Sequence, residues 1–282
     1  MGYADAATSS GDAFIDRARR LAFLQGGATM TLEWIFRIVE QYWPMFLRGA
    51  GITLLIALIG TVLGGMIGLL AGVVRTIPCP ERGVKRYLLK TINFILSVYI
   101  EFFRGTPMIV QAMVIFYGAA LAFGYHMNPI IAGVVIVSIN TGAYMAEIVR
   151  GGIISVDKGQ YEAAQAIGMN HIKTMINVVM PQVIRNILPA TGNQFIINIK
   201  DTAVLSVISI SELFFVTKTI AGNNYRYFEA FFVVCILYFI MTYTITLILR
   251  YIERRMDGPD NYVMTANQID TAEDIKRKNQ GM

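Results

Sequence analysis

Long uncharged stretches divide this chain into segments that are long enough to cross a membrane. Residues 50–74 hold 25 consecutive uncharged positions and residues 105–123 hold 19, against the roughly 20 apolar residues that a spanning helix needs. Three later stretches repeat the pattern, with only local interruption by charge. The sequence therefore predicts an all-α, polytopic membrane protein with five transmembrane helices, at residues 50–74, 105–123, 127–147, 187–211 and 230–249.

The first of these stretches carries glycine at four-residue intervals, at Gly60, Gly64, Gly68 and Gly72. On a helix such residues form one stripe, along which another helix can pack backbone to backbone. We interpret the stripe as a packing surface, because glycine offers no side chain for catalysis.

The second predicted span is preceded by an apolar stretch at residues 91–103, which is too short to cross by itself. Pro107 separates the two and would break or kink a continuous helix. If both pieces crossed, the basic loops at 75–90 and 155–181 would lie on opposite membrane faces. Because basic loops gather in the cytoplasm, we expect one crossing, with residues 91–103 as an approach helix.

Basic residues are unevenly shared between the two sides of the predicted membrane. Fifteen Lys and Arg residues fall at 75–90, at 150–185 and from 250 onward, and seven fall on the other side. The excess marks the cytoplasmic side, so the N-terminus is expected outside and the C-terminus in the cytoplasm. The net charge of +5 therefore suits a cytoplasmic membrane face, and we expect no nucleic-acid partner.

The ends of the chain differ in composition from the spans at 50–250. Residues 1–49 are predicted to form an N-terminal extension, poorly ordered up to residue 29, followed by an interfacial amphipathic helix that carries Trp34 and Trp43. Met30 is either an alternative start or the first residue after a specific extension. Residues 251–282 are charged and are expected to be a disordered cytoplasmic tail.

Composition argues against several classes of protein. Charged residues make up 15% of the chain, whereas soluble domains carry about 25%. Cys79, Cys235, His126 and His171 stand singly, so neither a disulfide framework nor a metal site is expected. There is no GxxxxGK[ST] run to hold a nucleotide phosphate and no nucleophile–base set. We therefore expect no cofactor and no enzymatic activity in this chain.

One polar segment lies between two predicted spans, at residues 155–181. Its Glu-Ala-Ala-Gln-Ala run favours a helix, and Gly168 stands where a short helix would stop. This segment resembles the cytoplasmic EAA loop of binding-protein-dependent ABC importer permeases, whose coupling helix docks on the ATPase subunit. The matching residues are Glu162, Ala163, Ala164, Gly168 and Pro181.

Two further motifs narrow the resemblance. The run from Glu101 to Pro107, with Gln111 after it, and the run IKDTAVLSVISISEL from Ile199 are similar to the polar amino acid subgroup of these permeases. The resemblance spans about residues 45 to 252. It implies the type I ABC importer permease fold and a place in the inner membrane of a prokaryote.

The resemblance also implies partners. Such a permease pairs with a second copy or a sister permease, surrounded by membrane lipid. Cytoplasmic ABC ATPase subunits bind the ATP and grip the Glu162 helices, and an extracellular or periplasmic amino acid-binding protein delivers the substrate. The permease then moves polar amino acids into the cytoplasm by alternating access.

Candidate pathway residues are the polar positions inside the predicted spans, namely Gln111, Asn140, Lys200, Asp201 and Thr202. Gln111 and Asn140 either line the pathway or hydrogen-bond between helices, and Lys200 and Asp201 either line it or pair with each other. The competing function is a proton- or ion-coupled secondary transporter, with Glu147, Lys200 and Asp201 as relay groups. That alternative leaves the Glu162 segment unexplained.

Overall fold

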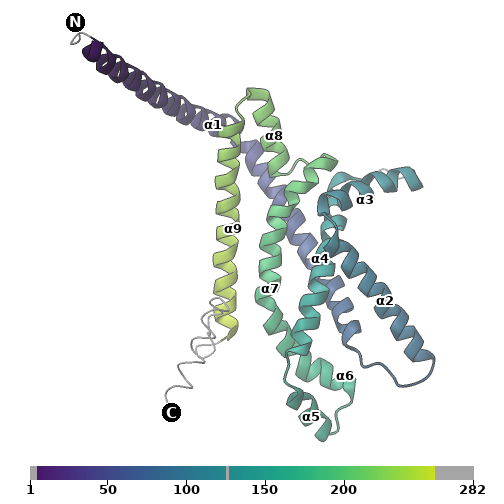
Figure 1. Ribbon diagram of the computed structural model, residues 1–282. Coiled ribbons are helices and arrows are strands. Elements are labelled where there is room, and N and C mark those ends of the chain that lie inside the picture. The colour runs from purple at the N-terminus through teal and green to yellow at the C-terminus, as the bar shows by residue number, and fades with distance from the viewer. Residues whose placement is uncertain (1–4, 125–126, 258–282) are drawn as a thin grey trace, which may run out of the picture.

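The computed structural model describes residues 5–124 and 127–257, and within these ranges every regular element is a helix (Figure 1). This confirms the predicted all-α class. Three helices are long and apolar enough to cross a membrane, at Thr31–Thr76, Pro129–Ile154 and Tyr227–Met256, and two bent helix pairs raise the possible number to five. His126 and the tail beyond Asp257 lie outside the described residues.

Helix α1 runs without interruption from Asp5 to Thr76. Its 72 residues would extend over about 110 Å at 1.5 Å per residue, far more than the roughly 30 Å of a bilayer core. The backbone from Asp5 onward forms one helix with no break before the predicted span, whereas the sequence predicted an extension followed by a separate interfacial helix. Poor order up to residue 29 stays a prediction. Pro44 lies inside the helix at an exposed position, and because proline has no N–H it donates no bond to the carbonyl four residues earlier.

The N-terminal part of α1 projects from the bundle, and its later part runs along α4, which spans Pro129–Ile154 (Figure 1). The glycine stripe forms this contact, which confirms the interpretation of the stripe as a packing surface. A Cβ atom added at Gly60 would lie 2.5 Å from Val137, and one at Gly64 would lie 2.6 Å from Thr141. The two backbones therefore approach more closely than any other residue would allow.

Between helices α2 (Val84–Gly105) and α3 (Met108–Phe123) the chain direction bends by 112°. Pro107 caps α3, as the break in the sequence predicts. The approach segment is longer than predicted, at 22 residues, and α3 has only 16. At 1.5 Å per residue, α3 extends about 24 Å, short of a bilayer core, and α2 about 33 Å; only as a bent pair do they count as one candidate span. That the pair crosses once stays a prediction.

The second half of the chain begins with two short helices, α5 (Lys158–Ala166) and α6 (His171–Thr174). A single π-helical turn, η1 (Met175–Val179), joins them to α7 (Met180–Asp201). A 3-10 segment, η2 (Thr202–Ile208), then leads to α8 (Leu213–Asn224) and α9 (Tyr227–Asp257).

Two apolar clusters position the parts of the candidate site. At one end of the bundle, Ile38 and Phe46 of α1 pack against α8 and α9, which explains why α1 continues beyond the predicted span. At the other end, Val149 and Ile153 of α4 pack against Met175 and Val179. The second cluster attaches the α5–α6 segment to the bundle.

Candidate functional site

The short helix predicted at the Glu-Ala-Ala segment is present as α5, and both of its ends are closed by local hydrogen bonds. The Asp157 carboxylate accepts a hydrogen bond from the Gly159 amide at 2.6 Å. At the other end, the Met169 amide donates to the Ala164 carbonyl at 3.0 Å, and the Gly168 amide donates to the Gln165 carbonyl at 2.9 Å. These two bonds define a Schellman motif. Gly168 has φ +79°, which confirms that the helix stops where the sequence predicted.

The residues of α5 divide between an inner and an outer face. Ala164 is 4% exposed and Tyr161 is half-buried, and the Tyr161 hydroxyl donates to the Ile153 carbonyl at 3.4 Å. Burial raises the pKa of this hydroxyl, which keeps it protonated as a donor. Glu162 and Ala163 are exposed. Of the expected docking residues in the helix, Ala164 therefore contacts its own chain, and the other two face outward.

Pro181 lies in the first turn of α7, directly after the π-helical turn. Proline has no N–H, so the bond that an α-helix would direct from residue 181 to the Asn177 carbonyl cannot form. The Met180 amide instead reaches back five residues, to the Met175 carbonyl. Helix α6, the π-helical turn and α7 are thus one continuous, slightly widened helical path.

Glu147 is held by two arginines where α1 and α4 end beside α5. It pairs with Arg75 of α1, and it accepts hydrogen bonds from Arg150 Nε and Nη2 at 3.0 and 2.9 Å. A relay group must release and take up a proton, and two guanidinium partners stabilise the charged carboxylate. The arrangement therefore favours a structural role for Glu147 over the relay of an ion-coupled transporter.

Gln111 and Asn140 are brought together behind the α2–α3 corner. Both are buried, and Asn140 Nδ2 donates to Gln111 Oε1 at 2.9 Å. Gln111 Nε2 in turn donates to the carbonyls of Phe103 and Thr106, at 3.0 and 2.9 Å. These carbonyls end α2 and lack helical partners. The two side chains thus form a hydrogen bond between helices. That they also line the pathway stays a prediction.

Lys200, Asp201 and Thr202 lie where α7 changes into the 3-10 segment. Thr202 is buried, and its hydroxyl donates to the Ile199 carbonyl at 2.9 Å. Lys200 is exposed and Asp201 is half-exposed, and no ion pair joins them within the described ranges. The mutual pair considered from the sequence is therefore not formed in this chain.

Sequence reasoning missed a buried polar cluster that joins α1, α4 and α7. Asn198 Nδ2 donates to the hydroxyls of Thr61 and Thr141, at 2.8 and 2.9 Å, and Gln194 Nε2 donates to Asn198 Oδ1 at 3.3 Å. All four side chains are buried. The available signal was the pair of amides four residues apart in an apolar stretch, which places both on one helix face.

Glu212 was also missed. Its side chain is fully buried and caps α8, accepting from the amides of Phe214 and Phe215 at 2.8 and 2.6 Å. The Tyr238 hydroxyl of α9 donates to the same carboxylate at 3.2 Å. Glu212 thus fixes the turn into α8 against α9.

Comparison with known proteins gives consistent matches over most of the chain. A family described as "Binding-protein-dependent transport system inner membrane component" matches residues 82–258. The glutamine transport system permease protein GlnP of Escherichia coli (strain K12) is 40% identical over 214 residues, which cover 76% of this chain and 93% of that protein. The L-cystine transport system permease protein TcyB of Bacillus subtilis (strain 168) is 34% identical over 225 residues, covering 78% and 90%.

A solved structure agrees with these matches. A chain from the crystal structure of an amino acid ABC transporter with histidines superimposes with a TM-score of 0.69. It is 38% identical in sequence, and the match covers 78% of this chain and 98% of that one. The helical arrangement described above is therefore that of an ABC importer permease.

Proposed function

Because this chain belongs to the family of binding-protein-dependent transport system inner membrane components, we propose that it is the permease subunit of an ATP-driven importer of polar amino acids. The observation that carries the proposal is α5, a short capped helix with its inner face seated on the bundle and its outer face open. Relatives named for glutamine and cystine transport support the substrate class. ATP hydrolysis would belong to a separate ATPase subunit.

The structure suggests how α5 would transmit movement. Ala164 and Tyr161 attach it to the cluster around Val149 and Ile153, and a tight turn at Gly168 connects it to α6, which the π-helical turn joins to α7. A push on the outer face would therefore move the cytoplasmic end of α7 together with α5. Closure of the ATPase subunits would use this connection to switch the permease between inward-open and outward-open states.

The docking role can be tested with two neighbouring alanines. In Ala163→Asp the new charge lies on the exposed face, so the chain should fold and insert normally but lose capture of the ATPase subunit and ATP-driven uptake. In Ala164→Asp the charge is buried, so the melting temperature of the purified chain should fall as well. Ala163→Ser is the uncharged control. Full capture and uptake by Ala163→Asp would show that this face does not dock.

The proposed pathway residues are Lys200 and Asp201, whose side chains remain accessible at the end of α7. An unpaired charge inside a membrane is costly unless it meets water or a partner. We therefore infer that Asp201 faces the pathway or the second permease subunit. Asp201→Asn should preserve assembly and lower uptake. Normal uptake by this variant would remove Asp201 from the pathway, and failed assembly would make its charge structural.

The proposed orientation places the N-terminus outside and the amino acid-binding protein on that side. In a chain freed of Cys79 and Cys235, a cysteine at the exposed Asn223 should react with an impermeant thiol reagent from outside. A cysteine at the exposed Lys173 should react only after the membrane is opened. Reversed labelling would overturn the orientation and, with it, the coupling role of α5.

A further inference from the structure

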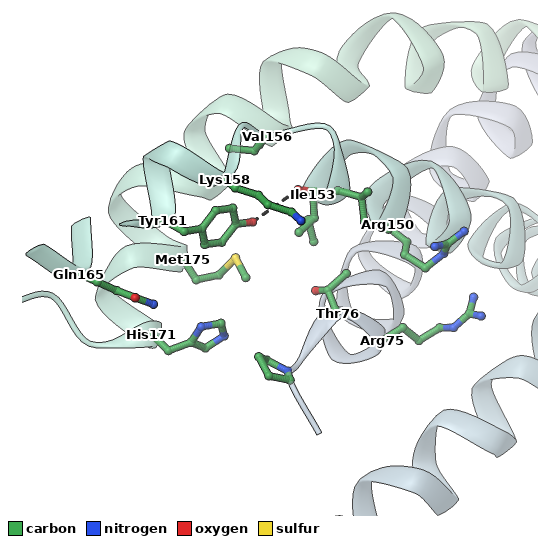
Figure 2. A pocket seen from close by; sticks show the side chains of 12 residues that line it. Arg75, Thr76, Arg150, Ile153, Val156, Lys158, Tyr161, Gln165, His171 and Met175 are labelled. Carbon is green, nitrogen blue, oxygen red and sulfur yellow. Dashed lines mark hydrogen bonds between the residues drawn. The ribbon is translucent and has the colours of Figure 1, made fainter. Parts of the chain in front are cut away.

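A cavity of about 500 Å³ lies between the ends of α1 and α4 and the α5–α6 segment. Four of its lining side chains are basic, and they come from four different elements: Arg75, Arg150, Lys158 and His171. Figure 2 shows Arg75 and Arg150 on one side, His171 on the other, and Lys158 reaching between them. The remaining lining is largely apolar and includes Ile153 and Met175. The cavity therefore combines basic and apolar walls.

The basic groups retain donors that the protein does not use. Glu147 binds one nitrogen of Arg75 and two of Arg150, so the three side chains together carry one net positive charge. Within residues 31–124 and 127–257, no acceptor is found for the Lys158 ammonium group, and no acidic side chain lines the cavity. The nearby Asp157 carboxylate is engaged in capping α5. The cavity thus offers excess positive charge and open N–H groups.

We propose that this cavity binds the phosphate group of an anionic ligand that also carries an apolar part. Guanidinium groups match phosphate oxygens in shape and charge, and the volume is that of an ordinary ligand site. Because the cavity lies where two spanning helices end, an anionic lipid and a small soluble phosphate are both possible sources. A bound phosphate would connect α1 and α4 to α5 and would steady α5 for docking. This inference goes beyond the proposed function, because it concerns a property of the chain alone.

The experiment measures binding to the purified full chain in neutral detergent, by native mass spectrometry and calorimetry. The probes are phosphatidylglycerol, phosphatidylcholine and inorganic phosphate. Lys158→Gln removes a cavity charge without touching the Glu147 pair, and it should weaken phosphatidylglycerol binding about five-fold, as expected for one basic residue beside an anionic headgroup. The matched control is Lys173→Gln, which removes an exposed charge of α6 that does not line the cavity. This control should bind as the unaltered chain does.

A second variant tests the cavity rather than its charge. Gln165 is exposed at the mouth, so Gln165→Trp fills space without changing charge and should also weaken binding. If inorganic phosphate binds and its binding depends on Lys158, the source is a soluble anion, and if only phosphatidylglycerol does so, the source is lipid. Either result supports the phosphate site. Equal binding of phosphatidylglycerol and phosphatidylcholine, or equal losses in Lys158→Gln and Lys173→Gln, would overturn it.

Discussion

Substitution of Gly68 by alanine should separate α1 from α4 at the narrowest point of their contact. An added Cβ would lie 2.7 Å from the Met145 carbonyl carbon and 2.8 Å from the Ala146 nitrogen, and closer still to the Met145 Cβ. Carbon atoms normally approach to about 3.5 Å. None of these three atoms can rotate away, so the two helices themselves must move apart by on the order of 1 Å.

The expected cost follows from two opposing effects. Overfilling a packed interior costs about 1–3 kcal/mol, and the immobile neighbours place Gly68→Ala at the upper end. Alanine gains about 1 kcal/mol over glycine through helix propensity. A net loss of about 2 kcal/mol remains, which corresponds to a fall in melting temperature of about 4–8 °C for a chain of this size.

The assay is thermal unfolding of the purified chain in detergent, with Gly65→Ala as the matched control. Gly65 lies on the same helix, and an added Cβ there would meet nothing within 4 Å. That variant should therefore be as stable as the unaltered chain or slightly more stable. If Gly68→Ala melts at the same temperature as Gly65→Ala, close backbone approach is not what holds these helices together.

Two further variants test features found in the structure. Asn198→Ala removes the donor shared by two buried threonine hydroxyls and should lower the free energy of unfolding by about 1–2 kcal/mol. Asn193 is exposed on the same helix, so Asn193→Ala should leave the free energy of unfolding unchanged. Equal effects of the two substitutions would refute a stabilising role of the buried cluster. Gly168→Ala forces a side chain into a left-handed conformation at a cost of about 1–2 kcal/mol and should speed amide exchange in α5, whereas Gly151→Ala, in open space on α4, should not. Unchanged exchange in Gly168→Ala would contradict the capping role.

For the glycine stripe, the sequence predicts which face of the helix packs but not which helix packs against it. Spacing alone places Gly60, Gly64, Gly68 and Gly72 on one helix face, because a helix repeats every 3.6 residues. The partner is not readable, because the facing residues of α4 have no distinctive pattern of their own. Val137 and Thr141 became recognisable as partners only when the two helices were seen together.

Helix ends were the hardest feature to predict. The change from polar to apolar residues near Ala50 marks where lipid would begin. The backbone hydrogen bonds of a helix form equally on both sides of that change, so the helix need not begin there. Contacts of Ile38 and Phe46 with α8 and α9 stabilise the helix on the polar side, and these contacts are remote in sequence. Hydropathy therefore predicted the apolar span but not the residue at which α1 begins.

Within the candidate site, the sequence predicted a helix at the position of α5 but not which face of that helix is buried. Ala163 and Ala164 are the same residue type, and successive residues on a helix point about 100° apart. Only the packing of α5 on the cluster around Ile153 decides which alanine is covered. Gly168 was predictable because its role is local, since a positive φ favours glycine whatever lies around it.

The π-helical turn at Met175–Val179 determines how the segment before it, which includes α5, is rotated about the axis of α7. Such a turn holds one residue more than an α-helical turn, so everything before it is rotated by about 100° compared with an uninterrupted helix. Consider a hybrid permease in which residues 155–181 come from a relative. The outer face of α5 would keep its direction only if the relative's sequence has the same number of residues through the π-helical turn. Deletion of a single residue there, such as Asn177, would turn Glu162 and its neighbours away from their present direction while leaving their own helix intact, and under the proposed docking it would abolish ATPase capture.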